Sequence, residues 1–342
     1  MIIIGIESTA HTFGVGIIKT DGKKRQSIKI PQCSILANER ALFTTKTGGM
    51  IPAKVAEHHI EKCDSVLKTA LKKAKIMPKE IDLIAYAASP GIGHSLRIGA
   101  AIARTLAVQL KKPIIGVNHC IAHLEIGRAM TPAKDPILLY LSGANTQVIA
   151  YEGKRYRIFG ESLDGGIGNF LDSFARMLGL GFPGGPLLYE LAYNTNDKKN
   201  YIPLPYTVKG MDVSFSGILT HLKRKIEQKT YTDKDLAFSA QETVFAMMIE
   251  VAERAMAHCN KQELLLGGGV ACNKRLQEMA KKMCRARKAK VYILPNELNV
   301  DNGAMIAWLG YEMYHVQKQG IAINRAGINP YLRTDEVEVF WR

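Results

Sequence analysis

A strand–turn–strand pattern occurs twice in this sequence, and it constrains the fold more than any other feature. In the second copy, the apolar runs 137–141 and 148–150 flank a turn that contains Ser142, Gly143 and Asn145. Short apolar runs rich in β-forming residues predict strands, and Ser, Gly and Asn are typical turn formers. The amide groups of such a turn can point outward and bind phosphate oxygens. A single copy would be interpreted as an ordinary hairpin.

The first copy lies near residue 1. The apolar run 2–6 precedes the polar residues 7–12, and a second apolar run follows at 13–18. Two similar units this far apart indicate a duplicated domain. Their two turns could face each other across a cleft and bind one phosphate chain. Glu7 would then lie near the phosphates or a metal ion; the alternative is a solvated turn residue.

Length, charge and cysteine content limit the class of protein. A chain of 342 residues exceeds the usual size of one compact core, which favours two lobes. The six cysteines include no CxxC pair, as expected for free thiols in a reducing cytoplasm. We expect no signal peptide and no membrane-spanning segment.

The net charge of +15, densest at residues 281–290, favours a polyanionic partner such as nucleic acid. A Lys-rich helix face is often simply solvated, however, and Lys enrichment also marks proteins from hot habitats. No signature of a common RNA-binding module supports the charge argument.

Between the two hairpins, the sequence predicts an irregular basic stretch up to about Thr47 and then alternating helices and strands. Apolar periodicity predicts a helix at about 53–74. A buried strand at 81–87, a glycine-containing loop at 89–93 and a helix at about 96–110 follow. Strand, glycine loop and helix form the local plan of an anion site. The pattern is neither a Walker loop nor GxGxxG, so this indication is weak.

The segment after the next short strand contains His119 and His123. Histidines four positions apart share one face of a helix and can bind one metal ion. Zinc proteases have this spacing too, but they need Glu directly after the first His, and here that residue is Cys120. Without further ligands, two histidines that pack a short helix would be the better interpretation. Carboxylates or a tyrosine elsewhere in the cleft could complete the site.

Three segments in the second half could contact a ligand or close the fold. Double glycine between prolines at 183–186, and the triple glycine 267–269 followed by Asn273, would let a flat ligand approach the backbone closely. Asp301 precedes the last long helix and is either its N-cap or a metal ligand. The alternating pattern at 334–342 predicts an edge strand.

These motifs resemble the actin and sugar-kinase (ASKHA) superfold. More specifically, the chain resembles the tRNA N6-adenosine threonylcarbamoyltransferase family, of the type found in the KEOPS complex of archaea and eukaryotes. The resemblance covers nearly the whole chain and rests on residues 5–11, 56–59, 89–93, 118–123, 140–146, 183–186 and 267–273. It implies an α/β fold of two duplicated ribonuclease-H-like lobes. Residues 1–125, joined by about 305–342, would form the first lobe, and 126–304 the second.

The resemblance also implies the residues of the site. The metal ligands would be His119, His123, Tyr140 and Asp301, holding one divalent ion, iron or zinc, per subunit. The substrate- or nucleotide-binding residues would be Tyr140, Leu141, Ser142, Gly143, Ala144, Asn145, Asp172, Gly185, Tyr189 and Asn273, with Glu7, Ser8, Thr9 and His11 possible on the phosphate side. The sequence departs from the family pattern at Ala144, where a glycine is usual. It departs again at Leu187 and Tyr189, where Lys and Glu are usual and Glu190 could substitute.

The implied protein is a cytoplasmic, metal-dependent acyltransferase. It would transfer the threonylcarbamoyl group from threonylcarbamoyl-AMP to N6 of the adenosine 3′ of the anticodon, in tRNAs that read A-starting codons. An ATP- or ADP-type nucleotide could occupy the cleft. The implied partners are tRNA and three kinds of KEOPS subunit: a small protein kinase, a small dimerising subunit and a tRNA-binding accessory subunit.

Three other functions compete with this expectation. An ATP-dependent small-molecule kinase of the same superfold would not need the histidine pair. A metalloprotease lacks the Glu that should follow His119. A non-enzymatic RNA-binding scaffold would fit the charge but would leave the metal-ligand pattern without a role.

Overall fold

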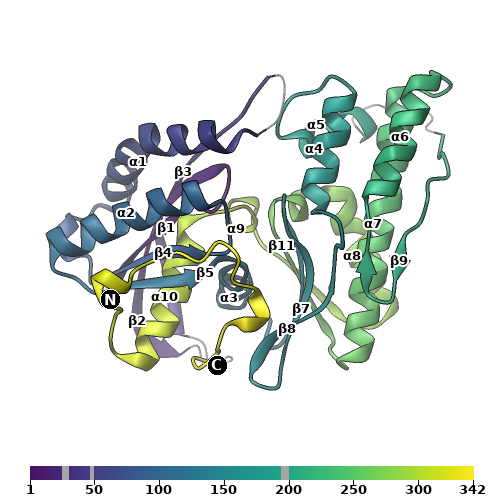
Figure 1. The fold of residues 1–342 in the computed structure, drawn as a ribbon. Helices are drawn as coiled ribbons and strands as arrows, with labels where there is room; N and C mark the ends of the chain where they lie inside the picture. The colour runs from purple at the N-terminus through teal and green to yellow at the C-terminus, as the bar shows by residue number, and fades with distance from the viewer. Residues whose placement is uncertain (25–30, 47–49, 194–199) are drawn as a thin grey trace.

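Two five-stranded mixed sheets organise the computed structural model, which describes every residue except 25–30, 47–49 and 194–199 (Figure 1). The first sheet has the strand order β3-β2-β1-β4-β5, and the second has the order β8-β7-β6-β11-β12. In both sheets the first three strands are antiparallel and the last two join in parallel. The same order and directions therefore occur twice, which confirms the duplication predicted from the two strand–turn–strand units.

The first sheet consists of β1 (Ile2–Glu7), β2 (Thr12–Lys24), β3 (Pro31–Leu42), β4 (Leu83–Ser89) and β5 (Ile114–Asn118). The second consists of β6 (Ile137–Leu141), β7 (Thr146–Glu152), β8 (Arg155–Glu161), β11 (Glu263–Gly267) and β12 (Lys290–Ile293). The short strands β9 (Val208–Lys209) and β10 (Asp212–Val213) pair separately.

The α-helices are α1 (Pro52–Ala74), α2 (Gly93–Leu110), α3 (His119–Met130), α4 (Ile167–Met177), α5 (Gly184–Tyr193), α6 (Ser216–Gln228), α7 (Asp233–His258), α8 (Lys274–Ala286), α9 (Asn296–Asn299) and α10 (Gly303–Gln317). The 3-10 helices are η1 (Pro78–Glu80), η2 (Gly269–Cys272), η3 (Ile323–Arg325) and η4 (Thr334–Glu336). None of the described helices is long and apolar enough to cross a membrane.

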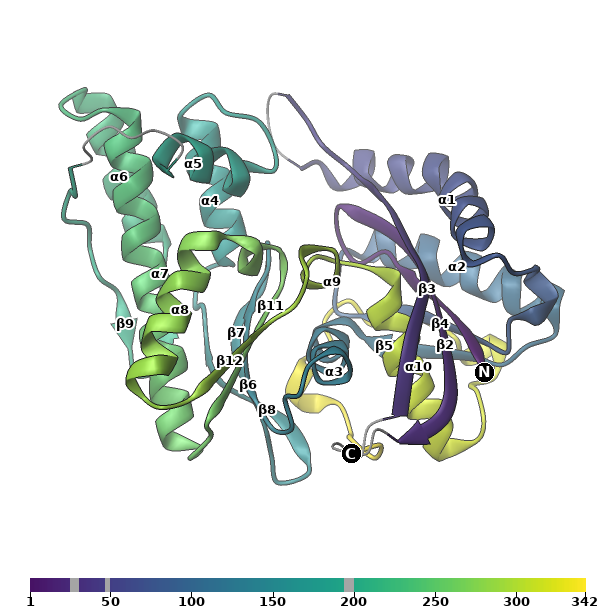
Figure 2. The ribbon, with the colours of Figure 1, turned by 180° about the vertical axis from the view of Figure 1, so that it is seen from behind.

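Helices α3 and α10 form a middle layer between the two sheets (Figures 1 and 2). Helix α10 packs on β1, β2 and β4, and α3 contacts both α10 and β11. Helices α1 and α2 cover the first sheet on its other side, and α7 packs against the second. Alternate residues of β6 enter different cores: Leu139 joins the core around α7, and Tyr140 joins the core of the middle layer. The middle layer therefore places Tyr140 beside α3.

The described part of the stretch after the first hairpin consists mainly of strands, contrary to the prediction, whereas residues 25–30 and 47 lie outside the described residues. Strand β2 extends to Lys24, and β3 pairs with it in antiparallel register, with Thr12 opposite Leu42. Helix α1 packs against both strands. The polar and glycine-containing sequence has little intrinsic β-propensity. Pairing with a strand distant in sequence and cover by a helix determine this structure instead.

A buried carboxylate joins α3 to the C-terminal residues. Glu125 is 1% exposed, and its oxygens accept hydrogen bonds from Arg128 at 2.6 Å, from Trp341 Nε1 at 2.9 Å and from the Tyr156 hydroxyl. Several donors are needed to keep a buried carboxylate charged.

The edge strand predicted at 334–342 is wrong, because residues 334–336 form η4 and no strand follows in the described chain. The Trp341 indole instead binds Glu125 in the middle layer.

Helix α10 approaches the first sheet through glycines. A Cβ atom at Gly16 would lie 2.0 Å from the amide nitrogen of Ala304, and one at Gly303 would lie 2.0 Å from the amide nitrogen of Gly16. A Cβ at Gly5 would lie 2.2 Å from the carbonyl oxygen of Gly303. Protein interiors are too densely packed to absorb a methyl group at such distances. The glycines thus let the start of α10, directly after Asp301, lie against β1 and β2.

We expect Gly16→Ala to lower the free energy of unfolding by about 3 kcal/mol, because backbone atoms would have to move. Urea denaturation followed by circular dichroism measures this change. Gly217→Ala in α6 is the matched control, since nothing lies within 4 Å of a Cβ there. It should be neutral or stabilising by about 0.5–1 kcal/mol. Similar effects of the two substitutions would contradict the close approach of α10.

The pKa of Glu312, on α10, leads to a second prediction. Burial raises this pKa to about 8; Glu125 adds to the rise and Arg128 opposes it. Between its ordinary value of 4.5 and about 8, the folded chain holds a proton that the unfolded chain releases. Stability contributed by this protonation is therefore lost as the pH rises through that range.

We expect Glu312→Gln to have little effect at pH 5 and to stabilise the chain at pH 9 by on the order of 3 kcal/mol. Urea denaturation at the two pH values gives the comparison. Glu338→Gln, at an exposed carboxylate, is the control and should show no such pH dependence. Equal pH profiles for the two variants would show that Glu312 titrates normally.

Candidate metal centre

Helix α3 presents the two histidines on one face. It starts directly after β5, and Asn118 caps it by accepting a hydrogen bond from the Ile121 amide at 3.2 Å. His119 and His123 are 4% and 1% exposed, and their ring centroids are 4.8 Å apart. The prediction that the pair shares one helix face is confirmed.

Tyr140 and Asp301 reach these histidines from two other parts of the chain. The Tyr140 hydroxyl lies 3.1 Å from Nε2 of His119. Oδ1 of Asp301 lies 3.3 Å from Nε2 of His119 and 3.4 Å from Nε2 of His123. Asp301 is not the N-cap of α10, because the side chain of Asn302 has that role. Four side chains from β6, α3 and the segment before α10 thus converge on one point.

The donor set fits a divalent metal ion. Two imidazole nitrogens, a phenol oxygen and a carboxylate oxygen are ligands suited to zinc or iron. Four donors at about 2.0–2.1 Å from a tetrahedral ion would lie roughly 3.3 Å from one another. The three donor pairs measured above are 3.1–3.4 Å apart. The Asp301 side chain is 12% exposed, which leaves access from solvent to the cluster.

Glu7 orients His119 from the end of β1. Its Oε2 lies 2.8 Å from Nδ1 of His119, and its Oε1 accepts the amide and hydroxyl hydrogens of Thr9 at 2.7 and 2.5 Å. A carboxylate on one ring nitrogen fixes the tautomer and directs the other nitrogen to a metal. Glu7 has no exposed surface, so it is not a solvated turn residue. Its carboxylate is directed at His119.

Burial and neighbouring charges shift the pKa values of the groups in the cluster. Burial lowers the pKa of His119, but Glu7 and Asp301 outweigh burial and hold this pKa well above its ordinary value. Burial raises the pKa of Asp301, and the charge of His119 outweighs it, so that this pKa lies well below its ordinary value. Burial lowers the pKa of His123, which favours the neutral imidazole that binds metals. Burial also raises the pKa of Tyr140. The cluster thus combines an imidazolium at His119, the carboxylate of Asp301 and a neutral imidazole at His123, and a metal ion bound at His119 would displace the Nε2 proton.

The turn between β6 and β7 presents amide groups close to Tyr140. The Ser142 amide donates to the Asn145 carbonyl at 2.9 Å, and the Asn145 amide donates to the Ser142 hydroxyl at 3.1 Å. Gly143 and Ala144 are exposed, and within the described residues neither amide has a hydrogen-bond acceptor. Adjacent free amides of this kind can bind an anion. The predicted turn is therefore present directly after β6, and its role in binding phosphate stays a prediction.

Helix α4 supports this turn. The amides of Gly168 and Asn169 donate to the carbonyls of Ser142 and Gly143 at 3.0 and 2.9 Å. A Cβ at Gly168 would lie 2.6 Å from Cα of Gly143. Sequence reasoning did not identify this support. Its signal is the glycine cluster at 165–168, which permits the close contact.

Other predicted nucleotide-binding residues lie on α4 and α5. Asp172 accepts the Gly184 amide at 2.7 Å, and burial raises the pKa of its carboxyl group. Gly185 and Tyr189 are both partly exposed on α5. Asp172 therefore fixes the start of α5, and Gly185 and Tyr189 remain accessible. Leu141, by contrast, is fully buried at the end of β6.

Several remaining candidates have their side chains committed inside the protein. Asn273 caps α8, and its side-chain amide donates to Gln241 at 3.0 Å. Ser8 is fully buried and Thr9 is 3% exposed. His11 is partly exposed. Any ligand contact by Asn273 or Ser8 would therefore come mainly from the backbone.

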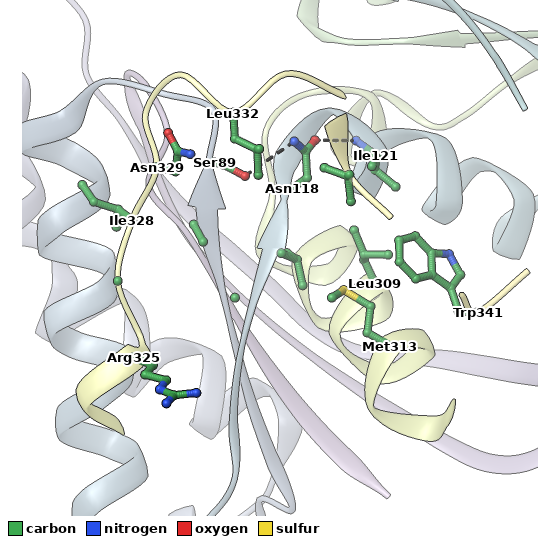
Figure 3. A pocket seen from close by; sticks show the side chains of 15 residues that line it. Ser89, Asn118, Ile121, Leu309, Met313, Arg325, Ile328, Asn329, Leu332 and Trp341 are labelled. Carbon is green, nitrogen blue, oxygen red and sulfur yellow. Dashed lines mark hydrogen bonds between the residues drawn. The ribbon is translucent and has the colours of Figure 1, made fainter. Parts of the chain in front are cut away.

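A cavity of about 400 Å³ lies beside α3 under the C-terminal segment (Figure 3). Ser89, Asn118, Leu309, Met313 and Trp341 are among its lining residues. The side-chain amide of Asn118 donates to the Ser89 hydroxyl at 3.5 Å. None of the four donors of the cluster lines this cavity. It is therefore separate from the metal centre.

Comparison with solved structures identifies the fold. HypF of T. kodakarensis superposes with a TM-score of 0.60 at 15% identity, over 93% of this chain and 48% of that one. Component A of the Acidaminococcus fermentans (R)-2-hydroxyglutaryl-CoA dehydratase superposes with a TM-score of 0.55 at 14% identity, over 92% and 99% of the two chains. At such identities the likeness concerns the fold alone. It confirms the predicted two-sheet α/β fold.

Comparison with known sequences identifies the family. The tRNA N6-adenosine threonylcarbamoyltransferase of Thermococcus sibiricus is 50% identical over the full length of both chains. That of Xenopus laevis is 46% identical over 100% of this chain and 99% of that one. A probable bifunctional tRNA threonylcarbamoyladenosine biosynthesis protein of Methanocaldococcus jannaschii is 48% identical over 100% and 60%. The model of the family described as tRNA N6-adenosine threonylcarbamoyltransferase matches residues 33–308. The chain belongs to the tRNA N6-adenosine threonylcarbamoyltransferase family.

Proposed function

We propose that this chain transfers the threonylcarbamoyl group of threonylcarbamoyl-AMP to N6 of the adenosine 3′ of the anticodon, in tRNAs that read A-starting codons. Its family makes it a tRNA-modifying transferase. The convergence of two histidines, a tyrosine and an aspartate beside a turn with free amides carries the more detailed proposal. A small-molecule kinase would use the turn but not the four donors, and the related proteins are named as transferases.

We propose that His119, His123, Tyr140 and Asp301 hold one divalent ion, iron or zinc. When bound, the ion would act as a Lewis acid on the carbonyl of the threonylcarbamoyl group. Glu7 would keep a proton on Nδ1 of His119 and leave Nε2 free as a ligand. The near-complete burial of both histidines would exclude water from that side of the reacting group.

The exposed turn would bind the nucleotide phosphate of the donor. The amides of Gly143 and Ala144 point to no acceptor in the described chain and follow Tyr140 closely in sequence. The phosphate and the reacting carbonyl would thus be held by neighbouring parts of one hairpin. An ATP- or ADP-type nucleotide could occupy the same place. Holding the donor and the tRNA adenosine in a fixed geometry would account for much of the rate acceleration over the uncatalysed reaction.

Partners and domain limits complete the proposal. This chain covers only 60% and 62% of two relatives named as probable bifunctional biosynthesis proteins, so those proteins contain an additional part. The word bifunctional in their names supports a partner activity that accompanies the transferase in this family. We propose the three KEOPS subunits (small kinase, small dimerising subunit and tRNA-binding accessory subunit) and a cytoplasmic location. The lobe limits, 1–125 with about 305–342 and 126–304, stay a prediction.

A reconstituted assay tests the reaction. Purified chain, with and without the partner subunits, receives tRNA, threonine, bicarbonate, ATP and an enzyme that makes threonylcarbamoyl-AMP. We expect mass spectrometry of digested tRNA to show threonylcarbamoyladenosine only when the chain is present. A tRNA that does not read A-starting codons is the matched substrate control and should stay unmodified. No product with all partners and metal supplied would favour the kinase.

Metal binding can be measured without the reaction. We expect one ion per wild-type chain after dialysis against zinc or iron(II), and none in the variant with His119→Ala and His123→Ala. Glu7→Gln should lower the metal affinity by about 10–100-fold, because His119 loses the carboxylate that orients it. His94→Gln, at an exposed histidine on α2, serves as the control.

Elemental analysis gives the metal content of each variant, and circular dichroism verifies that each is folded. If the folded double variant still contained one ion per chain, this cluster would be excluded as the metal site.

A further inference from the structure

A strongly basic segment begins at α8 and ends with β12. Residues 274–290 contain eight basic residues and one acidic residue, Glu278, which gives this segment a net charge of +7 out of +15 for the chain. Buried Leu276, Ala280, Met283 and Cys284 define the inward face of α8. The charged residues therefore project mainly from the opposite, outward face.

Six of the eight basic residues are exposed and form no ion pair within the described part of the chain. They are Lys274, Lys281, Lys282, Arg285, Lys288 and Lys290, and we call them the α8 basic stripe. Lys274, Lys281 and Arg285 follow one line along the helix over about 17 Å, at 1.5 Å per residue. Glu278 lies on the same line, but it is paired with Arg275. The stripe thus has a nearly uncompensated positive charge.

An ordinary solvated helix face does not account for this arrangement. Lysines in heat-adapted proteins typically form ion-pair networks, and α1 shows such pairs in Lys68–Asp64 and Lys73–Glu39. The α8 basic stripe has none. Like charges on neighbouring helix turns repel one another and destabilise the helix. The cluster is more easily understood if an anionic partner neutralises it.

The surface chemistry favours a nucleic acid over a protein as this partner. The core of a protein interface is apolar, but no large apolar side chain between 274 and 290 is among the exposed ones of the described chain. A phosphate backbone needs only exposed cations. RNA is also the polyanion on which the proposed reaction acts.

The stripe starts close to the metal centre. Strand β11 ends at Gly267, where a Cβ would lie 3.9 Å from Cβ of His123 and 4.0 Å from the Tyr140 ring. Asn273, six residues later, caps α8. In Figure 2, α8 extends from the region of α9 and β11 along the second lobe, away from the middle layer. A long polyanion with one nucleotide in the cleft could therefore continue along α8.

We propose that the α8 basic stripe binds the phosphate backbone of the substrate tRNA outside the nucleotide that enters the cleft. The inference rests on the proposed function, because that function makes tRNA the substrate. Contacts with phosphates position an RNA and carry no sequence information. The stripe thus contributes to the affinity for tRNA and leaves the chemical step to the metal centre.

The test compares two variants with the same change in charge. In the stripe variant, Lys281, Lys282 and Arg285 are changed to Gln. In the control variant, Lys62, Lys72 and Lys79 are changed to Gln; these are exposed cations on and after α1 that form no ion pair with any described residue. Circular dichroism and thermal unfolding verify that both variants are folded. Fluorescence anisotropy measures the affinity of each for labelled tRNA at salt concentrations of about 50–200 mM.

We expect the slope of log K against log salt to fall by about 2–3 in the stripe variant, since each lost phosphate contact removes about 0.7–0.9. The KM for tRNA should rise about tenfold or more while kcat stays unchanged. The control variant should lose much less affinity. Replacements that keep the charge, such as Lys281→Arg in place of the change to Gln, should leave the affinity for tRNA at the wild-type value.

Three outcomes separate this inference from its alternatives. Equal losses in the stripe and control variants would show an effect of net charge and overturn the proposal. Unchanged RNA affinity, with activity lost only when partner subunits are present, would assign the stripe to an acidic protein surface instead. A wild-type chain that does not modify tRNA, but whose RNA binding depends selectively on the stripe, would overturn the proposed reaction and support the stripe.

Discussion

The buried interaction of Glu7 with His119 is the constraint on which the rest of the site depends. It joins the end of β1, in the first sheet, to the first residue of α3, in the middle layer, at 2.8 Å. Burying a carboxylate is costly unless donors satisfy it, and Thr9 supplies two further hydrogen bonds. With Nδ1 of His119 engaged in this way, Nε2 faces Tyr140 and Asp301. The orientation of one imidazole thus links the first sheet to a cluster whose other members lie outside that sheet.

Packing determines how the remaining donors reach this imidazole. Glycines at positions 5, 16 and 303 let α10 lie directly against the first sheet, which places Asp301, two residues before the helix, at the histidines. Tyr140 arrives from the second sheet, because alternate residues of β6 enter the middle layer. The same strand ends in the turn with free amides. The proposed metal ligand Tyr140 and the proposed phosphate-binding turn are therefore neighbours, because one hairpin supplies both.

The surface around this centre suits a reaction between a small nucleotide donor and a large polyanion. The buried cluster is accessible mainly through the Asp301 side chain, while the turn at 142–145 is exposed. Helix α8 extends outward from the end of β11 and carries cations that form no ion pair with the described residues. A small substrate and a long one could thus approach the same centre from adjoining surfaces. The cavity beside α3 and the carboxylate of Glu125 lie apart from this surface, where the C-terminal segment joins the middle layer.

Residue spacing and motifs in the sequence by themselves determined the duplicated hairpins, the shared helix face of His119 and His123 and the family. These features are local, or recur as recognisable segments, so a linear pattern contains them. Local patterns alone left the third and fourth ligands open, and they also left open whether Asp301 caps a helix. The resemblance named Tyr140 and Asp301 as ligands. Only the tertiary structure decided that Asn302 is the cap, that Glu7 is directed at His119, that β3 is a strand and that Trp341 binds Glu125. Each of these depends on partners far away in the sequence, whose desolvation and pairing energies outweigh local propensity.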